Sequence, residues 1–239
     1  TDSKVSERLY CMHQLDVDAA WPGENGSLVQ TVHNPMGDGR NFISLGGSDF
    51  AGVRRAAQVF IGLLKPEGKS LAVGSLFRLE GGDKGPAPLG EAEIEQKGNA
   101  GPGYAVECGN ILRKYRTPGY GRVFRRAMEN YALSVADVDV LDEKTFKGGY
   151  PSFGELPLLW DMIEEDEQFD AADRELISNA LYVYAHLLRY ARLDTGDMGA
   201  GGNDHNADSA LYAGLYFNRY YPGLEIGRRL VERMDRYFA

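Results

Sequence analysis

Residues 194–209, DTGDMGAGGNDHNADS, gather the side chains with the clearest chemical potential in this chain. The segment is rich in glycine and brings together carboxylates, amides and one imidazole: Asp194, Asp197, Asn203, Asp204, His205, Asn206 and Asp208. An imidazole is the usual general base near neutral pH, and amides and carboxylates supply hydrogen bonds to a substrate. Long loops between packed helices commonly carry binding or catalytic residues, because a rigid scaffold positions them.

Three interpretations of this loop are open. Its carboxylate and amide oxygens suit calcium, although the spacing over 194–208 does not match an EF-hand loop. In the second interpretation the loop is a solvated connection, and Asn206 or Asp208 caps the next helix. In the third, Asn203, His205 and Asn206 line a catalytic site.

Three side chains on the helix that follows are expected to share one face. Tyr212, Tyr216 and Arg219 are spaced four and three residues apart, which places them on the same side of a helix. Buried tyrosine hydroxyls need hydrogen-bond partners, so an aromatic face with many hydroxyls suits a wet groove. Ordinary amphipathic packing, with the hydroxyls at the rim of the core, is the alternative.

A basic and aromatic segment lies earlier in the chain. Residues 111–126, ILRKYRTPGYGRVFRR, hold six basic residues and no acidic one. Arg122, Arg125 and Tyr120 belong to this segment. Arginine pairs with anionic groups and aromatic rings offer flat stacking surfaces, so the mixture predicts a site for an anionic chain of sugars. A solvated charged face is the alternative.

The composition argues against two classes of partner, nucleic acids and membranes. The chain has 239 residues with 35 acidic and 26 basic side chains, and a formal charge of −9, so we expect no nucleic-acid partner. No run approaches the roughly 18 apolar residues that span a bilayer, and the first residues contain no apolar signal core, so we expect no membrane partner. An export signal removed earlier is compatible with this sequence.

The cysteine and glycine patterns argue against several cofactor sites. Cys11 and Cys108 form no CxxC and no Cys/His cluster with zinc spacing, while a single disulfide between them stays open. The glycine-rich turn over 45–52 lacks both GxGxxG and the lysine of a phosphate-binding loop. A tight turn with Ser48 or Asp49 as the helix cap explains it better, and we expect no cofactor and no metal site.

The elements that position these residues fall into two units, so the predicted fold class is α+β. Residues 1–85 form a small amino-terminal α+β domain. Its expected elements are a hairpin of strands over 28–33 and 41–45, a helix from the cap to Leu64, and a strand over 70–79.

Residues 86–103 are rich in glycine and proline and predict an exposed linker. The second unit, residues 104–239, is expected to be all helical. One predicted helix begins at Thr117 and Pro118. The others cover 155–164, 170–193, 206–220 and 223–238.

Two parts of the sequence resemble glycan-degrading enzymes. GGNDHNADS leading into ALYAGLYFNRYY, a tight turn and a helix ending ERMDRYF resembles the α/α-toroid polysaccharide lyases, including the heparinase II/III-like and alginate lyase enzymes. FISLGGSDFAGVRRAAQVF, residues 42–60, is similar to the small α+β domains that precede catalytic domains in enzymes such as β-N-acetylhexosaminidases. A complete toroid has more helices than this sequence provides, so the resemblance implies the amino-terminal part of a longer enzyme.

The resemblance implies roles for the candidate residues. A lyase removes the C5 proton of a uronate, which requires neutralisation of the adjacent carboxylate, a base, and an acid for the leaving oxygen. Asn203 or Asn206 matches the neutralising group, His205 matches the base or neutralising group, and Tyr212 or Tyr216 matches the acid. The substrate-binding residues would be Arg219, Arg122, Arg125 and Tyr120.

The expected function is therefore a carbon–oxygen lyase, secreted or periplasmic and bacterial, that acts on an anionic polysaccharide. A non-catalytic carbohydrate-binding or scaffold module of a larger glycan-active protein is the first alternative. A helical module whose aromatic face is covered by a protein partner is the second.

Overall fold

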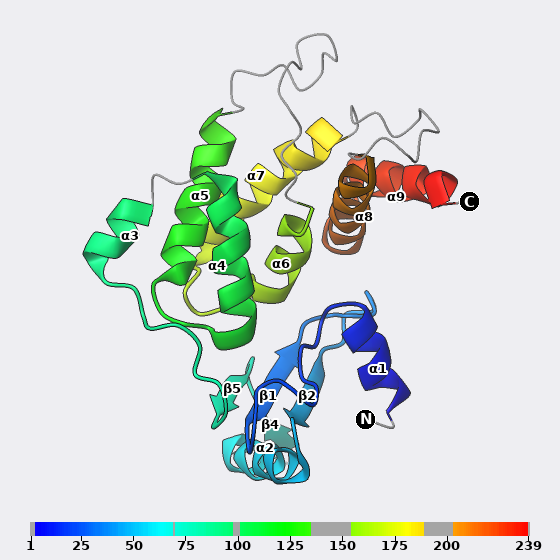
Figure 1. Cartoon of the computed structure of the whole chain (residues 1–239). Helices are drawn as coiled ribbons and strands as arrows, with labels where there is room; N and C mark the ends of the chain where they lie inside the picture. The colour runs from blue at the N-terminus through cyan, green and yellow to red at the C-terminus, as the bar shows by residue number, and fades with distance from the viewer. Residues whose placement is uncertain (1–2, 69, 98–100, 135–153, 189–202, 239) are drawn as a thin grey trace. The chain divides into compact units, whose positions relative to one another are not determined.

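The computed structural model describes residues 3–68, 70–97, 101–134, 154–188 and 203–238, without the side chains of 203–206 and 237–238. Contacts divide the chain into a first unit, residues 1–86 with 114–116, and a second unit, residues 87–113 with 117–239. The first unit combines a small sheet with helices, and the described part of the second unit is helical (Figure 1). The α+β fold class predicted from the sequence is therefore confirmed.

The sheet of the first unit is antiparallel, with strand order β2-β1-β5. Its strands are β1 (Ser27–Val32), β2 (Phe42–Gly47) and β5 (Phe77–Glu80). The predicted hairpin is confirmed, because β1 pairs with β2 in a register that places Val29 opposite Leu45. Since β1 lies in the middle, β2 is an edge strand.

Helix α2 (Phe50–Leu63) follows β2 after a tight turn. The Asp49 carboxylate accepts a hydrogen bond from the Gly52 amide at 2.7 Å, which confirms the predicted capped turn. A Cβ atom on Gly47 would lie 2.5 Å from the Gly52 carbonyl carbon, so the turn requires glycine there.

The two faces of β1 contact different apolar groups. Val29 packs with Ala56 of α2 and with Leu76. Val32 has the opposite side-chain parity along the strand, and it packs with Leu15 and with Leu9 of helix α1 (Lys4–Cys11). Helix α1 was not predicted from the sequence.

The single strand predicted over 70–79 is wrong. The structure instead has a separate hairpin of β3 (Lys65–Glu67) with β4 (Ser70–Ala72). Of the predicted range, only the part in β5 pairs with β1 in the three-stranded sheet. Leu71 of β4 is 63% exposed, so its side chain does not join the core of the first unit. An alternating pattern fits one long strand or two short ones equally well, so the break was not evident from the sequence.

The helices of the second unit are α3 (Glu91–Lys97), α4 (Pro102–Tyr115), α5 (Tyr120–Ser134), α6 (Leu156–Ile163), α7 (Ala171–Leu188), α8 (Asn203–Tyr220) and α9 (Glu225–Phe238). The predicted helices at α6, α8 and α9 are confirmed, and α7 is confirmed up to Leu188, while residues 189–193 lie outside the described residues. Helix α3 interrupts the stretch expected to be an irregular linker. Helix α5 begins later than predicted, because Gly119 still has a φ of +90°.

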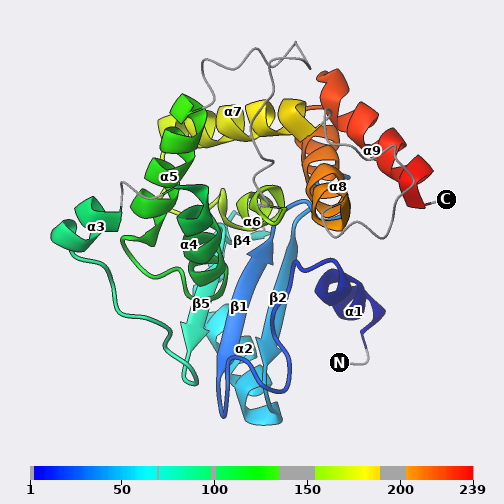
Figure 2. The ribbon, with the colours of Figure 1, turned by 45° about the horizontal axis from the view of Figure 1, so that its top comes forward.

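The apolar faces of three helices form much of the core of this unit. The buried side chains of α5, α7 and α9 include Val123, Phe124, Ala127, Tyr131, Ile177, Ala180, Leu181, Tyr184, Leu187, Leu188, Ile226, Leu230 and Met234. Helices α8 and α9 lie side by side after a turn closed by the Leu224 amide and the Tyr221 carbonyl at 2.8 Å (Figure 2). A Cβ on Gly227 would lie 2.4 Å from the Asn218 nitrogen, so α9 approaches the α8 backbone closely there.

Both cysteines are free thiols, so the disulfide left open by the sequence is absent between these two described residues. Cys11 is exposed, whereas burial raises the pKa of Cys108 to about 12. Among the described residues, no helix has the length and apolar character required to cross a membrane.

Candidate functional site

The α8 face predicted from the spacing of its polar residues meets acidic side chains on and beside α6. The Tyr216 hydroxyl donates to Glu164 Oε2 at 2.8 Å, and Arg219 Nη1 donates to Asp161 Oδ2 at 2.8 Å. The spacing of Tyr216 and Arg219 therefore predicted a shared face correctly. In the structure this face of α8 packs on α6, and each of the two residues has a carboxyl partner there.

Tyr216 belongs to a buried chain of hydrogen bonds. Trp160 Nε1 donates to Ser178 Oγ at 3.2 Å, and Ser178 Oγ lies 3.4 Å from the Tyr216 hydroxyl. Because Tyr216 donates its proton to Glu164, Ser178 is the donor to Tyr216 in this arrangement. Tyr216 is only 2% exposed, so its hydroxyl is satisfied inside the protein and does not face a wet groove.

Glu164 is the most strongly perturbed carboxyl group of this site. Its pKa is raised to about 8, mainly by burial and also by the neighbouring carboxylates of Asp161 and Glu165, whereas the hydrogen bond from Tyr216 opposes the shift. The group is therefore mainly protonated at neutral pH. A half-buried neutral carboxyl beside a buried phenol is the type of pair that holds a proton in an active site or fixes two helices in register.

Asp161 holds two groups of α8. Besides Arg219, its carboxylate accepts a hydrogen bond of 2.6 Å from the Tyr220 hydroxyl. The side chains of Arg219 and Asp161 are 13% and 9% exposed, so this ion pair is largely removed from water. The charge of Arg219, predicted to bind substrate, is therefore compensated by Asp161.

Tyr212 differs from Tyr216 in its surroundings. It is half-buried and has no hydrogen-bond partner among the described residues. Burial raises its pKa, and the carboxylates of Asp208 and Glu155 raise it further. The phenol therefore keeps its proton at neutral pH and is available as a donor.

The structure describes the backbone of the candidate residues at 203–206 but not their side chains. Helix α8 begins at Asn203, so positions 203, 205 and 206 occupy its first turn, and Asn206 and Asp208 lie inside the helix instead of capping it. The side chains of Asn203, His205 and Asn206 lie outside the described residues, as does the stretch over 194–202 to which the calcium interpretation largely applies. Position 205 precedes position 212 by two helical turns, which places both on one side of α8.

No family model, no curated protein and no solved structure matches this chain. The local geometry is therefore the basis of any functional assignment.

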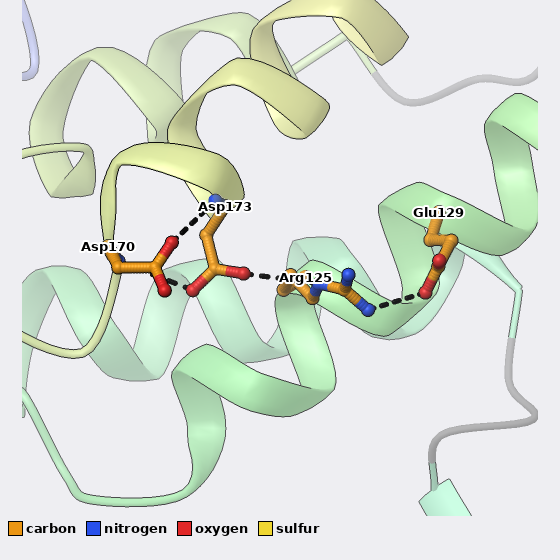
Figure 3. A network of polar contacts seen from close by, with 4 residues as sticks. All are labelled: Arg125, Glu129, Asp170 and Asp173. Atoms are coloured by element: carbon orange, nitrogen blue, oxygen red, sulfur yellow. Dashed lines mark hydrogen bonds and ion pairs between the residues drawn. The ribbon is translucent and has the colours of Figure 1, made fainter.

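Two arginines of the predicted cluster pair with carboxylates from other parts of the second unit. Arg122 makes two hydrogen bonds to Glu91, of 2.7 and 2.9 Å. Arg125 binds Asp173 at 3.1 Å through Nε and also pairs with Glu129 (Figure 3). Asp173 lies in the first turn of α7, so Arg125 links α5 to the start of α7.

The start of α7 is fixed by a reciprocal cap. The Asp173 amide donates to the Asp170 carboxylate at 2.9 Å, and the Asp170 amide donates to the Asp173 carboxylate at 3.3 Å (Figure 3). Asp170 therefore caps α7, at the start of the helix predicted over 170–193. Because Asp173 binds Arg125 as well, the cap and the ion pair stabilise the same junction.

A cavity of about 340 Å³ lies over the arginine cluster. Its lining residues are Glu91, Ile94, Glu95, Arg122, Arg125, Arg126 and Asp173. Arg126 is exposed and forms no ion pair in the described part of the chain. Tyr120, predicted as a stacking platform for sugar, is 7% exposed and packs in the core. Carboxylates balance the arginines of this cavity, so it is not a strongly cationic surface.

Sequence reasoning missed Asp161, Glu164 and Ser178. The signal for the first two was present in WDMIEED, where acidic residues spaced by three recur within an apolar helix. Charged residues on one side of such a helix require partners if that side is buried. Ser178 carried no signal of its own.

Proposed function

We propose that this chain is part of a polysaccharide lyase that cleaves a uronate-containing polysaccharide by β-elimination, with α8 carrying the reacting groups. The observation that supports this most directly is Tyr212. Its phenol is protonated and forms no hydrogen bond within the described residues, and position 205 lies two helical turns away on the same side of α8. Tyr216, the other candidate acid, is committed to Glu164.

The proposed elimination uses three kinds of group. Asn203 or Asn206 donates hydrogen bonds to the substrate carboxylate, which makes the C5 proton more acidic. His205 accepts that proton, the C4–O bond breaks as the C4–C5 double bond forms, and Tyr212 donates a proton to the leaving oxygen. Glu164 and Tyr216 hold α8 against α6 and contribute no proton to the substrate.

Two features of the second unit are compatible with an α/α toroid. Helices α8 and α9 form a close pair joined by a short turn, and α8 packs on both α6 and α7. Toroids are built from helix pairs of this kind. An enzyme with this substrate would act outside the cytoplasm, so we propose a secreted or periplasmic location.

The test is ultraviolet absorbance of the unsaturated uronate product, with the full chain incubated with alginate, glycosaminoglycans and plant uronate polymers. The proposal expects product from one of these polymers and its loss in His205→Ala and Tyr212→Phe. Tyr104→Phe is the matched control, because Tyr104 is an exposed tyrosine of α4. Product formation that survives both site variants would refute the assignment.

The non-catalytic alternative predicts a different result in the same experiment. A carbohydrate-binding module retains one of the polymers in affinity electrophoresis and yields no product. In that case His205→Ala leaves the retention unchanged, whereas Arg126→Ala weakens it, since Arg126 is the uncompensated cation of the 340 Å³ cavity.

A further inference from the structure

We propose that the open edge of β2 binds an extended peptide with basic side chains. In the order β2-β1-β5, β2 has a strand partner on one side only within the described residues. Alternate residues of an antiparallel edge strand direct their N–H and C=O groups away from the sheet. These groups form a template on which another strand can pair.

A cavity of about 580 Å³ lies along this edge. It is lined by Ser6, Glu7, Tyr10, Leu15, Val17, Asp18, Ala19, Ser44, Leu45, Gly46, Gly47, Ser48 and Val53. The volume is within the range of ordinary ligand sites. The lining includes Ser44 to Gly47 of β2 itself, so the strand backbone forms one wall.

The lining residues also locate the cavity at the free edge. Leu45 packs on the α2 side of the sheet, with Ala56. Gly46 has the opposite parity, and a Cβ there would lie 2.8 Å from Val17, so Val17 covers the other face. The cavity touches both Val17 and Val53 of α2, so it reaches both faces of β2 around its free edge and its carboxyl end, away from β1.

Helix α1 forms the opposite wall of this cavity. Figure 2 shows α1 beside β2, on the side away from β1. Ser6, Glu7 and Tyr10 of α1 line the cavity. A strand edge facing a helix across a groove is an arrangement into which an extended chain fits, with its backbone on the strand and alternate side chains toward the helix.

The charges of the lining select the chemistry of the ligand. The described lining has two carboxylates and neither lysine nor arginine. Hydrogen bonds from the amides of Trp21 and Ala20 and from the Tyr10 hydroxyl, together with the more distant charge of Lys114, lower the pKa of Asp18 and favour its ionised form. Glu7 is exposed and has no ion-pair partner in the described residues. A lysine or arginine side chain complements this site, whereas an anion is repelled.

Backbone pairing favours a peptide over a small molecule. The six residues of β2 present donors and acceptors at a two-residue repeat over about 20 Å. A peptide of five or six residues matches this repeat along its whole length. The site is in the first unit and is independent of the lyase proposed for the second.

The test is fluorescence anisotropy of the full chain with a labelled five-residue peptide that alternates valine and lysine. Glutamate replaces lysine in a second peptide, and two further peptides carry N-methyl groups on the odd or on the even residues. We expect the lysine peptide to bind at least about tenfold more tightly than the glutamate peptide. One N-methylated register should lose about tenfold in affinity while the other is unaffected, since a strand pairs through alternate residues.

Two variants connect this binding to the cavity. Glu7→Gln should weaken the lysine peptide by about threefold or more, whereas Glu24→Gln, an exposed glutamate outside the cavity, should have no effect. The proposal is overturned if the peptides do not bind at about millimolar concentration. Equal affinity of the two N-methylated registers, or an unchanged affinity in Glu7→Gln, overturns it as well.

Discussion

The Tyr216 hydroxyl donates a 2.8 Å hydrogen bond to Glu164, and this bond joins the middle of α8 to the residue that ends α6. The phenol is buried, and the carboxyl group that accepts the bond is protonated at neutral pH. A neutral pair of this kind avoids the cost of a buried charge and still fixes the two helices in register.

Tyr216→Phe removes this bond without leaving a cavity. The Glu164 oxygen and Ser178 Oγ both lose a partner, so the free energy of unfolding should fall by about 1–2 kcal/mol. Urea denaturation measures the change. Tyr104→Phe on the exposed side of α4 should stay within about 0.5 kcal/mol of the wild type. Equal values for the two variants would show that the buried bond contributes nothing.

Glu164 should make stability decrease as the pH rises. Its pKa is about 8 in the folded chain and near the ordinary 4.5 in the unfolded chain, so between these values the folded state binds more protons. The stabilisation is fully present below pH 4.5 and is lost as the pH passes 8, with a slope approaching roughly 1.4 kcal/mol per pH unit from this group.

The measurement is urea unfolding of the wild type and Glu164→Gln at several pH values from 5 to 8. The variant has no titrating group at this position. Its free energy of unfolding should therefore lack the decrease with pH that Glu164 contributes in the wild type. Glu167→Gln is the matched control, because Glu167 is exposed and is not one of the carboxylates that raise the pKa of Glu164, so it should keep the wild-type slope. Parallel curves for the wild type and Glu164→Gln would contradict the buried protonated carboxyl.

Local periodicity predicted much of the second unit, and pairing between distant residues accounts for what it could not. The spacing of Tyr212, Tyr216 and Arg219 correctly placed two of them on a common interface, because a helix repeats every 3.6 residues. The same spacing could not reveal that Asp161 and Glu164 on α6 face them. That depends on which helices pack together, and the sequence pattern contains no such information.

The arginine cluster and the split strand illustrate the same limit. Arg122 pairs with Glu91, thirty-one residues away, so a segment without acidic residues is still compensated in the fold. In the first unit, the alternation over 70–79 predicted a strand but did not reveal that β4 and β5 have different partners. The helix cap at Asp49 was predicted well, since a cap acts over three residues.

Asp161→Asn should destabilise the second unit strongly. The substitution leaves Arg219 charged and largely buried without its counter-ion, and it weakens the bond from Tyr220. Removal of one partner of a buried ion pair costs about 3 kcal/mol or more. Glu225→Gln on α9 is the control, because its pairs with Arg228 and Arg229 are exposed and should contribute less than about 1 kcal/mol. Similar losses in urea denaturation would indicate that the Asp161 pair is effectively solvated.

Gly227→Ala should separate α9 from α8. The new Cβ would lie 2.4 Å from the Asn218 nitrogen, a backbone atom that cannot move without the helix, so we expect a loss of about 2 kcal/mol in the free energy of unfolding. Gly223→Ala is the matched control in the same hairpin, because nothing lies within 4 Å of its added Cβ. Urea denaturation distinguishes the two, and equal stabilities would mean that α8 and α9 do not approach through Gly227. Since α8 carries Tyr212 and begins at Asn203, a displaced α8 should also lower product formation in the lyase assay, whereas Gly223→Ala should leave it unchanged.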